Sequence, residues 1–190
     1  MQTDQLLLKR AQKGDPTAFE SILATHERLI YSICLRMCGN REDAMDIAQE
    51  TAVRVWRNIG RYTGDAALST WIYRIATNAC LDHLRKQRDA LSIDELGEDG
   101  FSPATGEHEN PEGVLQGRET MRTVQHALML LPEEQRAAVI LRDIRNLTYE
   151  EVAQTLGINL NTAKSRISRG RRALREMLRS DEKLLQTGEA

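Results

Sequence analysis

The chain lacks any stretch apolar enough to span a membrane. None of its 190 residues falls in a run of the roughly 18 apolar residues that a crossing helix needs. It also lacks the apolar core and small-residue cleavage site of a signal peptide, because Leu6, Leu7 and Leu8 lie among charged residues in a short amphipathic segment. These absences predict a cytoplasmic protein with no membrane insertion.

Cysteine is scarce, and its three copies, Cys34, Cys38 and Cys80, form no His/Cys cluster that would complete a tetrahedral metal site. Cys34 and Cys38 are four residues apart on an expected helix and so could contribute to a metal site together. Both, however, occupy apolar helical positions, where a free cysteine packs as a small hydrophobic residue. The odd count argues against structural disulfides, and we expect neither a metal nor a cofactor.

The chain also has no net positive charge, since its formal net charge is -2. The charge is nevertheless unevenly distributed, and distribution decides what a surface attracts. Residues 89–113 hold eight acidic residues and no Lys or Arg, whereas residues 164–179 hold seven Lys or Arg and one Glu. A basic segment is therefore present and is hidden in the total by an acidic one.

The acidic segment divides the chain. Its glycines, prolines and lack of large apolar residues are typical of a flexible linker. We expect domains at 1–88 and 114–190, with the linker at 89–113. Both domains have apolar residues at helical spacing and no strand pattern or internal repeat, so the predicted fold is all-α. Helix starts are expected at Thr3, Asp15–Pro16, Asn40, Ser69 and Pro132, with the helix from Ser69 ending near Gln87.

The region from residue 147 to 179 predicts a helix-turn-helix. Thr148 and Glu151 form a capping box at the start of a short helix, and Gly157 permits the left-handed corner that follows. Asn159 can cap the second helix. Its inner stripe, spaced by three or four residues, consists of Ala163, Ile167, Gly170, Leu174 and Leu178.

The outer face of this second helix is suited to the major groove of duplex DNA. Short polar side chains at its start can approach base edges, and Lys and Arg at its flanks can contact phosphates. The alternative is a solvated charged face, but such faces normally mix charges of both signs. The outward residues are Asn161, Thr162, Lys164, Ser165, Ser168, Arg169 and Arg172.

Four motifs in order carry a family resemblance. They are DAMDIAQETAVRVWRNI at 43–59, LSTWIYRIATNACLD at 68–82, LPEEQR at 131–136 and KSR at 164–166. With these motifs the chain resembles bacterial RNA polymerase sigma factors of the extracytoplasmic-function (ECF) group over nearly its whole length. The resemblance implies a non-enzymatic, dissociable subunit that binds core RNA polymerase and promoter DNA. It also implies an anti-sigma protein as a partner, and no small-molecule substrate.

The resemblance assigns the third helix to core polymerase, at Asp46, Ile47, Gln49, Glu50, Val53 and Arg54. It assigns the following loop and fourth helix to the minus-ten element, read as melted strand. The matching positions are Arg61, Tyr62, Thr63, Arg74, Asn78, Asp82 and Arg85. Arg74 has an equally supported alternative, which is an ion pair with an acid of the third helix. Trp71 is better read as a core residue than as a stacking platform.

The resemblance assigns the helix-turn-helix to the minus-thirty-five element as duplex, at Thr162, Lys164, Ser165, Arg166, Ser168, Arg169 and Arg172. Some positions depart from the family pattern. Leu68 stands where an aromatic residue is common, and Asn161 and Ala163 replace a frequent Gly and Val. The acidic linker would pass near the polymerase cleft, where its carboxylates could mimic nucleic acid.

Two other function classes fit the sequence less well. A stand-alone helix-turn-helix regulator would need a ligand pocket and a dimer-read palindrome, and no dimerisation heptads are present. A recombinase would need a nucleophile with an arginine cluster. The four tyrosines lack such surroundings, and the four histidines, at 26, 83, 108 and 126, show no catalytic spacing.

Overall fold

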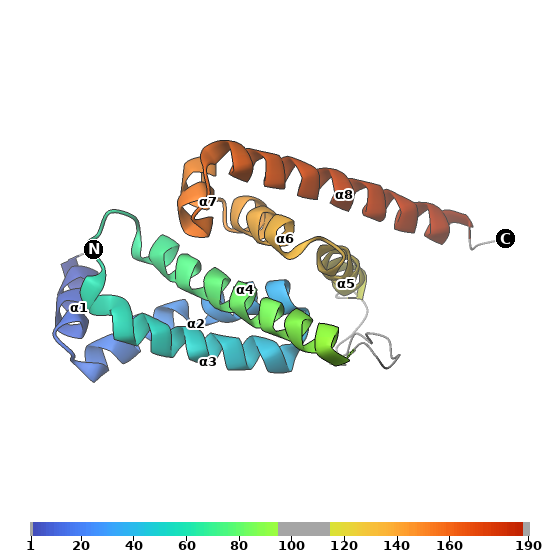
Figure 1. Cartoon of the computed structure of the whole chain (residues 1–190). Helices are drawn as coiled ribbons and strands as arrows, with labels where there is room; N and C mark the ends of the chain where they lie inside the picture. Colours follow the sequence, from blue (N-terminus) through green and yellow to red (C-terminus); the bar gives the residue numbers. More distant parts are fainter. Residues whose placement is uncertain (1, 95–114, 188–190) are drawn as a thin grey trace.

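A computed structural model describes the backbone of residues 2–94 and 115–187, and the side chains of residues 5–90 and 121–179 (Figure 1). Over these ranges it contains helices and no strand, which confirms the all-α prediction. The elements are α1 (Gln2–Gln12), α2 (Pro16–Cys38), α3 (Arg41–Asn58), η1 (Ile59–Arg61), α4 (Leu68–Asp94), α5 (Leu115–Met129), α6 (Glu133–Val139), η2 (Ile140–Ile144), α7 (Tyr149–Leu156) and α8 (Leu160–Thr187).

The first four helices form the N-terminal half, and local signals set their ends. Asp15 caps α2 by accepting a hydrogen bond from the Ala18 amide, and Pro16 supplies a first residue that needs no amide partner. Gly39 ends α2 with a φ of 83°, and Asn40 then caps α3 through the Asp43 amide. The chain therefore reverses between two long helices within two residues, which lets α2 and α3 pack closely along each other.

The last four helices form the C-terminal half and contain the predicted helix-turn-helix. The capping box between Thr148 and Glu151 has both of its hydrogen bonds, 3.1 Å and 2.8 Å long. Gly157 turns the corner with φ 64°, and Asn159 accepts a 2.8 Å hydrogen bond from the Thr162 amide at the start of α8. Of the predicted inner stripe, Ala163, Ile167 and Gly170 are buried, and Leu174 and Leu178 are half-buried.

Several predicted helix ends were wrong. Pro132 caps α6 rather than opening it, and α4 begins at Leu68, so Ser69 lies within its first turn. Thr3 likewise lies inside α1. The helix α4 continues to Asp94, beyond Gln87, because residues 88–94 contain no glycine or proline to stop it. The first six residues of the expected linker, 89–94, are therefore helical, and the rest of it, 95–113, lies outside the described residues.

The two halves pack against each other. Figure 1 shows α6 and α7 beside α4, and the buried apolar residues form one continuous cluster across both halves. Contacts join α4 to α7 and α2 to α5. At one of them the α position of Gly39 is so close to the Met129 side chain that a Cβ there would lie 2.7 Å from its sulfur. The two halves are therefore connected by a packed interface as well as by the chain between them.

The three cysteines lie in the core of the N-terminal half, free and buried. Hydrogen bonding to the thiols of Cys34 and Cys38, together with burial, raises the pKa of the Cys80 thiol. Among the described residues, no group of His, Cys, Asp or Glu side chains could hold a metal ion. No helix in the described ranges is long and apolar enough to cross a membrane.

Candidate partner and nucleic-acid surfaces

The outer face of α3 combines acidic, amide and apolar side chains. Asp46, Gln49 and Glu50 are exposed, and Val53 beside them is 46% exposed. Met45, which the sequence analysis did not select, is 52% exposed and lines a shallow apolar groove between α2 and α3 with Leu23 and Ala48. Exposed valine and methionine side chains next to carboxylates suit a partner helix that offers both apolar and basic residues.

One predicted member of this surface points the other way. Ile47 is 1% exposed and packs in the core of the N-terminal half. Its position follows from helical spacing, because Ala44, Ile47 and Val55 all lie on the buried side of α3. Ile47 therefore fixes the helix in place and presents no surface to a partner in this structure.

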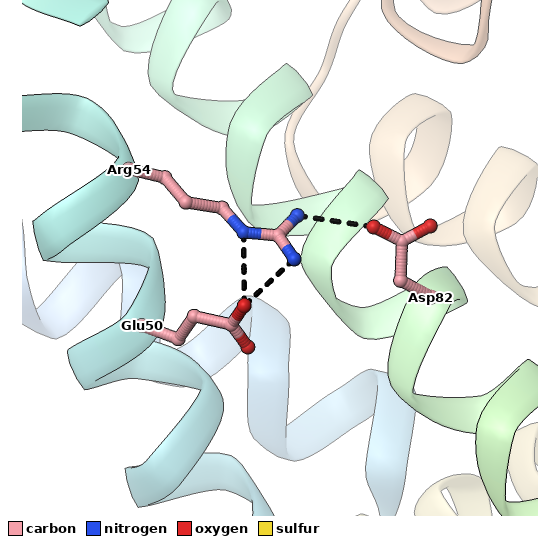
Figure 2. A network of polar contacts seen from close by, with 3 residues as sticks. All are labelled: Glu50, Arg54 and Asp82. Atoms are coloured by element: carbon pink, nitrogen blue, oxygen red, sulfur yellow. Dashed lines mark hydrogen bonds and ion pairs between the residues drawn. The ribbon is translucent and has the colours of Figure 1, made fainter. Parts of the chain in front are cut away.

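Arg54 joins α3 to α4 through an ion-pair network (Figure 2). Its guanidinium donates to Glu50, one turn earlier on α3, at 3.1 Å from Nε and 2.7 Å from Nη2. Its Nη1 donates to Asp82 on α4 at 3.0 Å. Burial alone would lower the pKa of Arg54, but the bonds to Glu50 and Asp82 outweigh it and raise the pKa. Among the described residues, Glu50 of the third helix thus pairs with Arg54, and Arg74 forms no ion pair with an acid of that helix.

A second polar cluster fixes the other end of the same two helices. Asp43 accepts hydrogen bonds from Asn40 at 2.6 Å and from Gln87 of α4 at 3.1 Å, with His83 Nε2 3.4 Å away. Burial raises the pKa of Asp43, yet these donors lower it below its ordinary value. The two clusters hold α3 and α4 in one register, so the surfaces that they present keep a fixed relation.

The loop after η1 is held by its own side chains. Tyr62 donates from its hydroxyl to the Ala66 carbonyl at 2.6 Å, and its ring lies 5.4 Å from that of Trp71. Gln12 of α1 donates to the Tyr62 carbonyl at 2.8 Å. Tyr62 and Trp71 therefore shape the loop, and the half-buried Trp71 fits its interpretation as a packing residue. Arg61 and Thr63 are exposed on the loop surface.

The residues of the polar stripe along α4 differ in their exposure to solvent. Asn78 and Arg85 are exposed, whereas Asp82 is engaged by Arg54. Arg74 is half-buried and lines a small cleft with Tyr62 and Trp71 of its own half and with Gln154 and Thr155 of α7. The start of the helix-turn-helix thus lies directly over the beginning of this stripe.

The exposed face of α8 carries most of the predicted DNA-facing residues. Lys164, Ser168, Arg169 and Arg172 are exposed, and Thr162 and Ser165 are half-buried. Arg166 differs, because it lies beside α6 and forms an ion pair with Glu134. An arginine held in this way supports the packing of α8 on α6 and is less available to a phosphate.

Tyr149 and Arg175 are residues that sequence reasoning missed. They line a groove on this face with the predicted Lys164, Ser168 and Arg172, and with Arg171. Tyr149 lies under Arg142, whose guanidinium carbon is 4.9 Å from the ring centroid, and Lys164 Nζ is 6.0 Å from it. Arg171 pairs with Asp143, and this bond raises the pKa of Arg171. The run of arginines at positions 169, 171, 172 and 175 was a usable signal for Arg175. Tyr149 lies at the start of α7 and reaches the groove only because the turn at Gly157 folds α7 against α8.

The amino-acid sequence is similar to known protein families and to individual proteins. Residues 22–90 match the family described as Sigma-70 region 2, and residues 121–174 match the one described as Sigma-70, region 4. The chain is 37% identical over 177 residues to the ECF RNA polymerase sigma factor SigW of Bacillus subtilis, covering 90% of this chain and 95% of that protein. It is 33% identical to the ECF RNA polymerase sigma-E factor of Escherichia coli, with 90% and 92% covered.

Structural comparison agrees. The fold is similar to that of the sigma factor RpoE of Bartonella quintana, solved in complex with the anti-sigma factor NepR. The TM-score is 0.70 at 26% identity, over 86% of this chain and 98% of that one. CnrH, solved with the cytosolic domain of CnrY, shares the fold with a TM-score of 0.66 at 21% identity, over 94% and 98%.

The bridge made by Arg54 yields a stability test. Its side chain is about one-third exposed, and exposed ion pairs contribute at most about 1 kcal/mol. We therefore expect Arg54→Gln to lower the free energy of unfolding by less than about 1 kcal/mol, with a smaller difference in 1 M salt. Urea unfolding followed by circular dichroism at low and high salt measures this. A loss of several kcal/mol would show that the bridge holds the fold together.

Proposed function

The chain belongs to the ECF RNA polymerase sigma factors, and from that membership we propose how its two halves divide the work of promoter recognition. As a member, it is a non-enzymatic initiation subunit that binds core RNA polymerase and directs transcription to promoters. The observation that carries the proposal is the presence of two chemically different surfaces, one mixed and acidic on α3 and one basic on α8.

The α3 surface binds core polymerase in this proposal. Met45 and Val53 supply exposed apolar area, and Asp46, Gln49 and Glu50 supply acceptors around it. Apolar residues at the centre of a patch carry most of the binding energy, while the charged rim selects the partner. Arg54 acts from behind this surface by orienting Glu50.

The loop at 59–67 and the exposed stripe of α4 hold the melted minus-ten strand. Arg61 and Arg85 can follow the phosphate backbone, and Asn78 offers an amide that can both donate to and accept from a base edge. Asp82 would repel phosphates if it were free, and its pairing with Arg54 reduces that repulsion. Tyr62 and Thr63 shape the loop, since both are bonded within it.

The α8 face reads the minus-thirty-five element as duplex DNA. Thr162, Ser165 and Ser168 lie near the helix start, where short polar groups approach base edges. Lys164, Arg169 and Arg172 contact phosphates on either side, and the groove adds Arg175. Arg166 contributes by holding α8 on α6 through Glu134.

An anti-sigma protein is a further partner in this proposal. Because core RNA polymerase works in the cytoplasm, we propose that the chain acts there.

Binding to core polymerase can be tested at Val53. A carboxylate placed at the centre of an apolar contact is desolvated without a partner. We expect Val53→Asp to raise the Kd for core polymerase at least about fivefold, because central apolar contacts are worth more than about 1 kcal/mol. A fluorescence titration of labelled chain with core enzyme measures it.

One control accompanies this titration. Leu6→Asp makes the same kind of change at an exposed leucine of α1. It should bind core polymerase nearly as the unaltered chain does. Equal affinities for Val53→Asp and Leu6→Asp would remove the α3 surface from the polymerase interface.

Duplex binding can be tested at Lys164. Each lost phosphate contact lowers the slope of log affinity against log salt by about 1. For holoenzyme on a duplex selected from random DNA, we expect Lys164→Ala to reduce the slope by about 1, with sequence preference kept. Lys13→Ala, a matched change at an exposed lysine outside α8, should leave the slope unaltered. An unchanged slope for Lys164→Ala would exclude its phosphate contact.

A further inference from the structure

Arg171 lies in the middle of a row of residues along the basic face of α8. Lys164, Ser168, Arg171 and Arg175 are spaced by four, three and four positions, and residues at this spacing share one face of a helix. All four line the same groove, together with Arg172. The proposed function assigns phosphates to Lys164, Arg172 and Arg175 and none to Arg171, although Arg171 lies among them on the helix.

Asp143 of η2 holds the Arg171 guanidinium by two hydrogen bonds. Arg171 Nε donates to Asp143 Oδ2 at 3.0 Å, and its Nη2 donates to Asp143 Oδ1. A pair of charged groups joined by two bonds is stronger and more specific in its geometry than a single contact. The hydrogen bond to Asp143, with a smaller contribution from Tyr149, outweighs burial and raises the pKa of Arg171. The guanidinium is therefore held by the protein itself in the absence of DNA.

The segment that carries Asp143 is fixed to the helix-turn-helix by its other residues. Arg142, its neighbour in the chain, donates to the Leu147 carbonyl at 2.7 Å. The guanidinium carbon of Arg142 also lies 4.9 Å from the centroid of the Tyr149 ring, at the start of α7. These two contacts do not involve Arg171. A change of the Asp143 side chain alone therefore leaves its backbone in place beside α8.

The pair compensates one positive charge of a groove whose charged lining is basic. The described side chains that line the groove include four cations, those of Lys164, Arg171, Arg172 and Arg175, and no acid. Asp143 does not line the groove, yet its carboxylate neutralises one of these four cations. A protein cation contributes to duplex affinity by replacing a counterion on a phosphate. Since a cation that faces a carboxylate brings no net charge to the phosphate, Arg171 adds little to that affinity while the pair lasts.

We propose that Asp143 limits the affinity of the helix-turn-helix for duplex DNA by withholding Arg171 from the phosphate backbone. This inference rests on the proposed function, because it takes the α8 face as the surface that binds the duplex. The phosphate backbone carries no sequence information directly, so the limit applies to every duplex alike. Sequence preference stays with the short polar side chains at the start of α8, which the pair does not engage.

A limit on sequence-independent affinity suits a subunit that must find few sites among many. Binding to arbitrary DNA comes almost entirely from phosphate contacts, and it holds a protein on DNA that carries no promoter. A carboxylate beside Arg171 could also do the opposite and orient the arginine toward a phosphate that it already contacts. Removal of the Asp143 charge would then weaken duplex binding, whereas the limiting role requires that it strengthen binding. The two roles therefore differ in the sign of one measurable effect.

The experiment compares holoenzyme that contains the unaltered chain with holoenzyme that contains Asp143→Asn. The asparagine keeps the size of the side chain and one acceptor but lacks the charge that compensates Arg171. Fluorescence anisotropy measures affinity across a range of salt concentrations for two labelled duplexes, one selected from random DNA and an unrelated one of the same length. On both, the slope of log affinity against log salt should steepen by about 1. When salt is lowered about fourfold, the affinity of the variant should rise about 3.5 times more than that of the unaltered chain.

The double variant Asp143→Asn/Arg171→Gln is the matched control. It deletes both charges of the pair, so the net charge of the chain is unaltered and no arginine is released. Its slope should return to that of the unaltered chain on both duplexes. The side chains of Arg171 and Asp143 are 41% and 33% exposed, and exposed pairs contribute little to stability. Each variant should therefore keep its helical circular dichroism, and Asp143→Ala, which removes both acceptors, should steepen the slope as Asp143→Asn does.

Two results would overturn the limiting role of Asp143 and leave the proposed function standing. An unchanged or shallower slope for Asp143→Asn would show that the released Arg171 gains no phosphate contact. A steeper slope that persists in the double variant would show that the lost negative charge acts without the arginine. By contrast, unaltered holoenzyme that binds the selected and the unrelated duplex equally, with no dependence on salt, would remove the proposed function and this inference with it.

Discussion

The buried guanidinium of Arg136 is the interaction on which the arrangement of the two halves depends. It is 5% exposed and donates to the carbonyls of Met129 and Leu131 in its own half and of Met37 in the other. A buried charge must be hydrogen-bonded to be tolerated. One side chain therefore fixes both the turn between α5 and α6 and the position of that turn against α2.

The interface between the halves combines these hydrogen bonds with buried apolar residues, which form one continuous cluster across both halves. The α3–α4 pair is tied by Arg54 at one level and by Asp43 at another, so the surfaces on these two helices keep a fixed relation.

Features that depend on neighbouring residues could be predicted from the sequence, whereas contacts between distant residues could not. The capping box at Thr148, the corner at Gly157 and the cap at Asn159 depend on a few neighbouring residues, so the sequence was enough to place them. The burial of Ile47 could be read from helical spacing, but the family resemblance also assigned it to a partner. The roles of Arg54, Arg136 and Arg171 depend on residues 28 to 99 positions away, and no periodicity in the sequence encodes those pairings.

Promoter recognition at two unlike sites is the central claim, and transcription in vitro tests it most directly. The chain would be mixed with core RNA polymerase on a library of genomic DNA fragments, and the transcript start sites would be mapped. The account predicts new start sites that share two different sequence elements at a constant spacing upstream. Start sites identical to those of core enzyme alone, or new sites that share a single palindromic element, would contradict it.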